Sequence, residues 1–352
     1  MHQRFAALLL LLVLVLPVFP AASQDGSTLT VVTHDSFNYS DAVMEQFQQE
    51  SGITVEVLRA GDAGAMLNQS ILSRENPLGD VMFGVDNTFL GRALDNDLFI
   101  PYESPNLEGI PEDFIVDAEH RVTPIDYGDV CLNYDVAYFE ENDLELPDSL
   151  AALTQPEYSG MLVVENPATS SPGLAFLLAT VATFGTEGDY TYLDFWADLV
   201  ANDVLVVDGW EAAYYGAFSL YAEDDPRPLV VGYANNPPVE VYYADPTPET
   251  APTGAIVADG TCFRQIEFAG ILNGTDNLEG AQQFIDFLLS VPFQEDMPLN
   301  MFVFPVNPDA ELPEIFTEYA AVPENPAVLS SDDINTHRDE WIEAWTEVVM
   351  QQ

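Results

Sequence analysis

Three hydroxyl residues, Thr169, Ser170 and Ser171, stand in a polar loop between a short apolar run and a helical apolar pattern. The run Met161–Val164 predicts a buried strand, and Pro172 is a residue favoured in the first turn of the helix that follows. Hydroxyls, free backbone N–H groups and the positive end of the helix dipole therefore meet at this point. Such a helix start can bind an anion without lysine or arginine, although an ordinary Ser/Thr helix cap is the alternative interpretation.

Two aspartates offer the opposite charge, and each follows a predicted strand. Asp35 comes just after the strand Thr28–Thr33, and Asp86 comes just after the strand Asp80–Gly84. In an α/β sheet, the carboxyl ends of parallel strands border the crevice in which ligands bind. A single aspartate after a strand is usually a helix cap, but two at equivalent places favour a site for a cation.

The elements that position these residues begin with a βαβ unit, which predicts an α/β fold with a parallel sheet. The helix Asp41–Ser51 and the strand Ile53–Ala60 follow the first strand, and the helix Ala65–Arg74 precedes the next one. The extended runs Val122–Tyr134 and Gly260–Ala269 bracket a middle segment that has strands and helices of its own. We also expect strands at Val204–Val207 and Leu229–Tyr233, helices at Glu211–Tyr221 and Leu278–Leu289, and a loop with an irregular strand at Pro237–Pro252.

The two long extended runs predict a two-lobe architecture with a hinge of crossing strands. Residues 27–127 and 264–352 would form lobe 1, and residues 128–263 would form lobe 2, inserted between the crossing strands. Two lobes joined by a hinge close around small ligands. Cys131 and Cys262 lie one in each crossing strand, so they would meet at the hinge. In an oxidising compartment such a pair suggests one disulfide, and two buried free thiols are the alternative.

The composition narrows the class of partner. The chain has 352 residues, room for about two domains, and its 59 acidic and 8 basic residues give a net charge of -51. All of the basic residues are arginines. Nucleic acids and anionic membrane surfaces both require clustered cations, so we expect neither as a partner. The charge favours cationic small ligands instead.

The first residues carry a targeting signal. Met1–Ser23 has a short basic start, an unbroken apolar core and a small-residue end, which together predict a secretory signal peptide. No other segment is long and apolar enough to span a bilayer. We therefore expect a protein that is secreted across the cytoplasmic membrane to the periplasm or the cell surface.

The chain offers little for catalysis. Its four histidines are scattered, and it contains no Gly-x-Ser-x-Gly elbow, P-loop or histidine-rich zinc spacing. We therefore expect a non-enzymatic protein that needs no cofactor and no resident metal.

A family resemblance is carried by segments spread over most of the chain. THDSF lies at the first strand end, DVMFGVDNTFL at the third strand and PIDYGDVCLNYD at the crossing, followed by NPATSSPGLAFLL, the DGW turn, VGYANNPP, GTCFRQIEFAGIL and FVFPV. In this order and spacing they resemble the thiamine-binding family of periplasmic solute-binding proteins of ABC importers. The resemblance implies a type II two-lobe fold that binds thiamine or its mono- or diphosphate in the cleft. It also implies delivery to the membrane subunits of an ABC permease, by a protein that we expect to be a monomer.

The same resemblance implies roles for the polar residues named above. Asp35 and Asp86 would face the cationic, amine-bearing ligand. Thr169, Ser170 and Ser171 would receive its phosphate or hydroxyethyl end. These roles agree with the chemistry that the residue types suggest on their own.

Aromatic residues complete the implied site. Trp210 and Tyr233 would lie beside the ligand, and Phe302 would offer a third aromatic wall. Phe302 stands where the family places a tryptophan, and Val239 stands where an aromatic residue follows the NPP turn. A phenylalanine can still stack on a ligand ring, whereas a valine offers only an apolar wall.

Three other functions are open alternatives. A ferric-ion carrier of the same fold class would use adjacent tyrosines, for which Tyr214-Tyr215 and Tyr242-Tyr243 are candidates. A thiaminase-like transferase would use a cysteine nucleophile with a carboxylate base, and Cys131 beside Asp129 could fill these roles. A polyamine carrier would be attracted by the same carboxylates.

Overall fold

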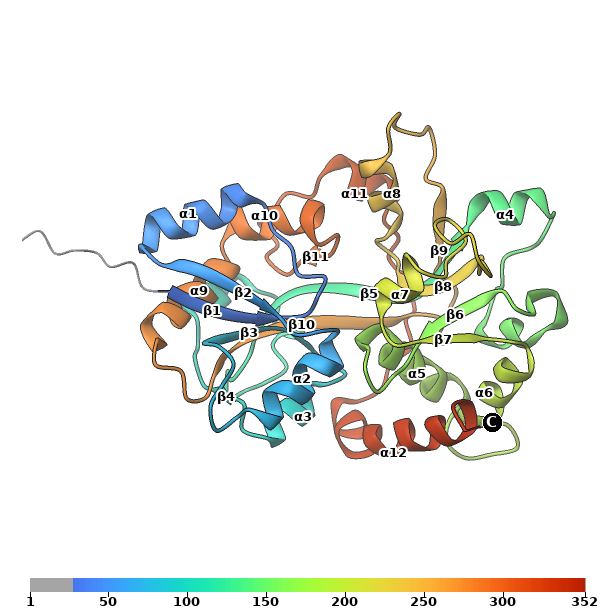
Figure 1. The fold of residues 1–352 in the computed structure, drawn as a ribbon, viewed down its shortest axis with the longest axis horizontal. Coiled ribbons are helices and arrows are strands. Elements are labelled where there is room, and N and C mark those ends of the chain that lie inside the picture. The colour runs from blue at the N-terminus through green and yellow to red at the C-terminus, as the bar shows by residue number, and fades with distance from the viewer. Residues whose placement is uncertain (1–27, 352) are drawn as a thin grey trace, which may run out of the picture.

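Strands and helices alternate along most of the chain, as the sequence predicts for an α/β protein (Figure 1). A computed structural model describes residues 28–351. The strands are β1 (Thr28–Thr33), β2 (Thr54–Arg59), β3 (Val81–Asp86), β4 (Phe99–Ile100), β5 (Thr123–Asp135), β6 (Leu162–Glu165), β7 (Leu205–Val207), β8 (Leu229–Tyr233), β9 (Thr253–Ile256), β10 (Phe263–Leu272) and β11 (Phe304–Pro305). The α-helices are α1 (Asp41–Ser51), α2 (Ala63–Leu72), α3 (Leu90–Asp95), α4 (Val136–Glu141), α5 (Ser171–Phe184), α6 (Tyr192–Ala201), α7 (Trp210–Tyr214), α8 (Pro237–Tyr243), α9 (Leu278–Leu288), α10 (Val291–Asn300), α11 (Glu314–Tyr319) and α12 (Ser331–Val349).

The first βαβ unit shows how local sequence sets the element boundaries. The β1 sequence TLTVVT is rich in the β-branched residues that suit a strand. Ser40 caps α1, because its side chain accepts a hydrogen bond from Val43 N at 3.3 Å. Gly52 ends the helix in the left-handed conformation. The bounds of β1 and α1 therefore agree with the prediction.

The strands of the described chain join in one sheet. Within residues 28–351 it has eleven strands, and its main path runs β2-β1-β3-β10-β5-β8-β6-β7. The pairs β1–β2, β1–β3, β6–β7 and β6–β8 are parallel, whereas β10 pairs antiparallel with both β3 and β5. The sheet thus has a parallel part at each end and antiparallel strands that join them.

The strands β5 and β10 connect the two halves of the molecule, and Figure 1 shows both running from one half to the other. They are 13 and 10 residues long and pair with each other in antiparallel register. These are the crossing strands that the sequence predicts, so the α/β class with a hinge of crossing strands is confirmed. The lobe boundaries, 27–127 with 264–352 and 128–263, stay a prediction.

The last helix, α12, contacts both halves. The rings of Trp345 and Trp196 of α6 are 5.5 Å apart between centroids, and Arg338 lies 5.6 Å over the ring of Phe89, just before α3. Figure 1 shows α12 along the lower edge of the molecule, beneath the half that holds α5 and α6, with its start near α3. Part of the chain that the sequence assigns to lobe 1 therefore packs against lobe 2.

Two middle segments differ from the prediction. The helix expected over Glu211–Tyr221 is α7, which ends at Tyr214, after which the chain continues in turns. The loop expected over Pro237–Pro252 begins with the helix α8. The first two residues of α8 are prolines, and in the first turn of a helix a missing N–H costs no hydrogen bond. The prolines that led us to expect a loop therefore begin a helix.

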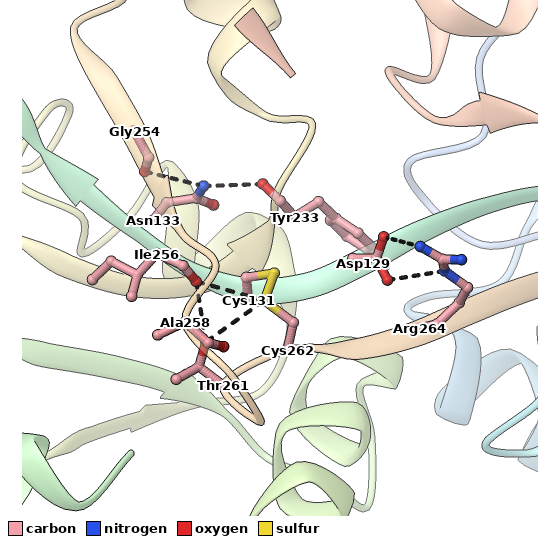
Figure 2. Close-up of a disulfide and its surroundings, with 10 residues drawn as sticks. All are labelled: Asp129, Cys131, Asn133, Tyr233, Gly254, Ile256, Ala258, Thr261, Cys262 and Arg264. Atoms are coloured by element: carbon pink, nitrogen blue, oxygen red, sulfur yellow. Dashed lines mark hydrogen bonds and ion pairs between the residues drawn. A yellow bond between two sulfur atoms is a disulfide. The ribbon is translucent and has the colours of Figure 1, made fainter. Parts of the chain in front are cut away.

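The two cysteines form the disulfide Cys131–Cys262 at the hinge (Figure 2). The prediction of a disulfide is confirmed, and the free-thiol alternative is wrong. Beside it, Asp129 of β5 accepts hydrogen bonds from Arg264 of β10, from Nε at 3.0 Å and from Nη2 at 2.8 Å. A covalent and an ionic cross-link therefore fasten the two crossing strands at neighbouring positions.

The predicted signal peptide, Met1–Ser23, lies outside the described residues. Among the helices of residues 28–351, none combines the length and the apolar character that crossing a membrane requires.

Candidate ligand-binding cleft

A cavity of about 830 Å³ lies between the two halves, a size typical of small-molecule sites. Residues of both predicted lobes line it. Six of the predicted site residues are among them, namely Asp35, Thr169, Ser171, Trp210, Tyr233 and Phe302. Val239 lines it as well, as the apolar wall that its side chain predicts. The two other predicted residues, Asp86 and Ser170, are fully buried and do not border the cavity.

Two acidic side chains lie opposite each other on the crossing strands β5 and β10. We call the part of the cavity that these two strands line its floor. Asp126 of β5 and Glu267 of β10 are partners in the antiparallel register, and both line the cavity. Like charges in such positions destabilise a sheet. Asp126 is 1% exposed, and within residues 28–351 neither of its carboxyl oxygens has a hydrogen-bond partner. A proton shared with the Glu267 carboxyl group accounts for part of this arrangement, and a bound ligand can supply the remaining hydrogen-bond partners.

The pKa values of the titratable side chains on and beside the floor depend on one another. Burial, followed by the Glu267 carboxylate, raises the pKa of Asp126 well above its usual range. His34 Nε2 lies 3.3 Å from Glu267 Oε1. Burial alone would lower the pKa of His34, but Glu267, together with Asp62 and Asp35, outweighs burial and raises the pKa above its usual value. We therefore expect a neutral Asp126 beside a Glu267 carboxylate that is paired with His34. Such a floor can both donate and accept hydrogen bonds.

Aromatic rings form the walls of the cavity. Trp210 stacks on Tyr214 with 5.0 Å between centroids and 20° between planes. The Trp210 indole N–H has no hydrogen-bond partner within the described chain. The hydroxyl of Tyr233 donates to Gln265 Oε1 at 2.7 Å, which fixes its ring, and Phe302 lines the cavity from lobe 1. These faces suit a flat or cationic ring.

The predicted helix start holds a carboxylate of the protein itself. α5 begins at Ser171, and Ser170 is its N-cap residue. Asp62, just before α2, accepts hydrogen bonds from Ser170 Oγ at 3.1 Å and from Ser171 N at 3.4 Å. It also accepts one from Trp210 N at 3.2 Å. Thr169, next to them, donates its hydroxyl to the carbonyl of Asp208 at 2.7 Å. The predicted donors are therefore present, and the anion that they hold is Asp62.

Asp86 lies behind the cavity wall, which corrects the expectation that it faces a ligand. It is the last residue of β3, a strand buried along its whole length. Its carboxylate accepts hydrogen bonds from Thr88 N at 2.6 Å, from Gln265 Nε2 at 2.7 Å and from Ser171 Oγ. Burial raises its pKa to about 7, although the Thr88 donors act in the opposite direction. Asp86 thus holds Gln265 and Ser171, two residues that line the cavity.

The sequence analysis does not identify Asp62, Asp126 or Glu267 as site residues. Asp126 and Glu267 each interrupt an apolar extended run, in PIDYG and QIEFA, and an acid inside such a run is the signal that could have revealed them. Asp62 follows β2 much as Asp35 follows β1. The rule that led to Asp35 could therefore have included it.

Comparison with known proteins places the chain in a family. Residues 76–324 match the family model of bacterial extracellular solute-binding proteins. The chain belongs to this family. The thiamine-binding periplasmic protein of Salmonella typhimurium is 28% identical over 326 residues, which cover 91% of this chain and 93% of that protein. The thiamine-binding periplasmic protein of Escherichia coli is 28% identical over 346 residues, 97% of each chain.

Solved structures share the fold of this solute-binding protein. A periplasmic thiamin binding protein matches with a TM-score of 0.79 at 24% identity, over 95% of this chain and 99% of that one. A ferric binding protein from Campylobacter jejuni matches with a TM-score of 0.71 at 17% identity, over 91% and 99%. The predicted type II periplasmic-binding-protein fold is confirmed. Its relatives work outside the cytoplasmic membrane, which agrees with the predicted export.

The thiaminase-like alternative does not fit this solute-binding protein. Its candidate nucleophile, Cys131, is bonded to Cys262, and a sulfur in a disulfide cannot attack a substrate. The candidate base, Asp129, is engaged by both hydrogen bonds from Arg264. The hinge residues are therefore structural.

The ferric alternative requires tyrosines that ionise readily. Burial raises the pKa of Tyr215 to about 12, and Tyr214 donates its hydroxyl to Glu240 at 2.9 Å. The second candidate pair, Tyr242-Tyr243, packs around Phe302 with centroids 5.9 and 5.8 Å away. The first pair is therefore engaged through the Tyr214 hydrogen bond, and the second through packing against Phe302.

Proposed function

We propose that this protein binds thiamine in the cleft and delivers it to an ABC permease. One observation carries the proposal: two opposed acidic groups, Asp126 and Glu267, lie on the floor of a cavity with aromatic walls, and within residues 28–351 no donor of another residue reaches the carboxyl oxygens of Asp126. The names of the relatives, thiamine-binding periplasmic proteins, support the choice of this cation. The proposal covers thiamine and its mono- and diphosphate, which share the same two rings.

The chemistry of thiamine matches the floor and the walls. Its aminopyrimidine ring carries an amino group that donates hydrogen bonds and ring nitrogens that accept them. A neutral Asp126 beside Glu267, which contacts His34, supplies one donor together with several acceptors. The thiazolium ring is a flat cation, which gains from the faces of Trp210 and Tyr233 and from the acidic surroundings.

The architecture supports a transport role. Rotation about β5 and β10 would bring the two walls together around thiamine and exclude water. The closed shape would then differ from the open one, and a permease that recognises the closed shape would receive only the loaded protein. We infer that the protein acts in this cycle as a monomer, because each chain carries a complete cleft.

Calorimetric titration of the exported protein with thiamine, spermidine and ferric citrate tests the proposal. We expect one-to-one binding of thiamine and much weaker binding of the other two compounds. A well-folded protein that binds spermidine or ferric citrate more tightly than thiamine, or does not bind thiamine, overturns it.

A further inference from the structure

Two aromatic rings from different predicted lobes meet in the lining of the cavity. Phe302 of lobe 1 and Tyr243 of lobe 2 both line it, and their ring centroids are 5.8 Å apart with 55° between the ring planes. Phe302 is 7% exposed, whereas Tyr243 is 65% exposed. A buried ring and an exposed ring therefore stand side by side, and the exposed one lies where the cavity opens to solvent.

The backbone of Phe302 has an unfavourable conformation that its neighbours stabilise. Its φ of 53° lies in the left-handed region, which is unfavourable for a residue with a bulky side chain. The side-chain amide of Asn235, a fully buried residue of lobe 2, donates a hydrogen bond to the Phe302 carbonyl. The Phe302 N–H donates to the carbonyl of Met297 at 3.2 Å. Backbone strain of this kind is concentrated at ligand sites, which agrees with a role of this ring in binding.

The orientation of α8 brings Tyr243 to the cavity. Glu240, in the middle of this helix, is buried and accepts hydrogen bonds from the hydroxyls of Tyr214, at 2.9 Å, and Tyr221. Val239 and Tyr243 are four residues apart, so they lie on one face of the helix, and both line the cavity. Val239 offers only an apolar wall, and Tyr243 adds an aromatic ring one turn further along the same face.

We propose that Tyr243 is a ligand-binding residue whose ring, together with Phe302, covers a flat ring of the bound ligand at the mouth of the cavity. An exposed tyrosine can contact water through its hydroxyl while the cleft is empty, and its ring face gains free energy when a flat cation covers it. Because Tyr243 and Phe302 belong to different lobes, closure of the cleft would bring both rings onto the ligand. The inference rests on the proposed function, because it assumes a ligand with flat rings.

Calorimetric titration of the wild type, Tyr243→Ala and Tyr242→Ala with thiamine tests this inference. Tyr243→Ala should weaken binding about tenfold, as expected for the loss of one ring that stacks on the ligand. Tyr242 is a matched control, because it is adjacent in sequence, 47% exposed and 5.9 Å from the Phe302 ring, but does not line the cavity. Tyr242→Ala should therefore change the affinity by about twofold at most. Both side chains are exposed, so both variants should fold.

Two further measurements separate the ring of Tyr243 from its hydroxyl and binding from release. Tyr243→Phe keeps the ring, so its affinity for thiamine should equal that of the wild type. In stopped-flow experiments Tyr243→Ala should raise the dissociation rate about tenfold and leave the association rate nearly unchanged, because the ring covers a ligand that is already bound. Equal losses of affinity in Tyr243→Ala and Tyr242→Ala, or a loss in Tyr243→Phe as large as in Tyr243→Ala, overturn the inference.

Failure of the inference can be told from failure of the proposed function. If Tyr243→Ala binds thiamine as tightly as the wild type does, the role of Tyr243 is overturned while thiamine binding stands. If a folded wild type does not bind thiamine, the proposed function fails. Titration with N-methylquinolinium, a flat aromatic cation, then decides about Tyr243. Binding that is weaker in Tyr243→Ala than in the wild type and Tyr242→Ala supports the role of this ring, and no binding or equal binding overturns it.

Discussion

Reduction of the Cys131–Cys262 disulfide should lower the free energy of unfolding by about 5 kcal/mol. The two cysteines are 131 positions apart, and the loop that they close contains nearly all of the predicted lobe 2. A cross-link of this span removes much of the freedom of the unfolded chain, and the loss grows with the logarithm of the loop length. The folded state should change little, because the ion pair Asp129–Arg264 and the β5–β10 ladder still join the same strands.

Urea unfolding followed by tryptophan fluorescence, with and without dithiothreitol, measures this effect. The reduced wild type keeps both sulfur atoms in their buried positions, so the comparison isolates the cross-link from any cavity. The double variant Cys131→Ala and Cys262→Ala is the control, and its unfolding curve should not respond to dithiothreitol. A loss below about 1 kcal/mol in the fully reduced wild type would contradict the view that this cross-link stabilises the protein through the unfolded chain.

Three single substitutions test other parts of the structure. Arg264→Leu should lower the free energy of unfolding in urea by about 2 kcal/mol, because the buried Asp129 carboxylate loses both of its charged donors. The free energy of unfolding of Asp86→Asn should increase relative to that of the wild type as the pH rises from about 4 to 7. The difference should change by up to about 4 kcal/mol over this range in urea unfolding experiments. The sign follows because the folded wild type keeps, up to a pKa of about 7, a proton that the unfolded chain releases near 3.8. Trp210→Ala should weaken thiamine binding about tenfold in calorimetry, since it removes the ring that forms one wall.

Most of the fold could be predicted from local sequence. The strand Thr28–Thr33 and the helix Asp41–Ser51 have strong patterns and clear ends, and the structure has the same bounds. The disulfide could be predicted because the extended runs near 128 and 263 had to cross. The segment Pro237–Pro252 could not be predicted, because prolines that end most helices stand in the first turn of α8.

The candidate site could be predicted only in part, and the reason is geometric. Residues that follow a strand or begin a helix, such as Asp35 and Ser171, reach the cavity because the topology sends those ends to the cleft. Asp86 ends a strand too, but β3 is covered on both faces and the carboxylate lies in the interior. Asp126 and Glu267 are distant in sequence and become a pair only through the register of β5 and β10.

The affinity of thiamine for Glu267→Gln, compared with Glu56→Gln and the wild type, tests the central claim most directly. Both variants lose one carboxylate from the same lobe, but only the first loses it from the floor of the cavity. If the opposed acids bind the aminopyrimidine ring of thiamine, Glu267→Gln should weaken binding about 10- to 100-fold in calorimetry, as expected for a lost charged hydrogen bond. Glu56→Gln should bind like the wild type. Equal affinities of all three proteins for thiamine would contradict the account of the cleft.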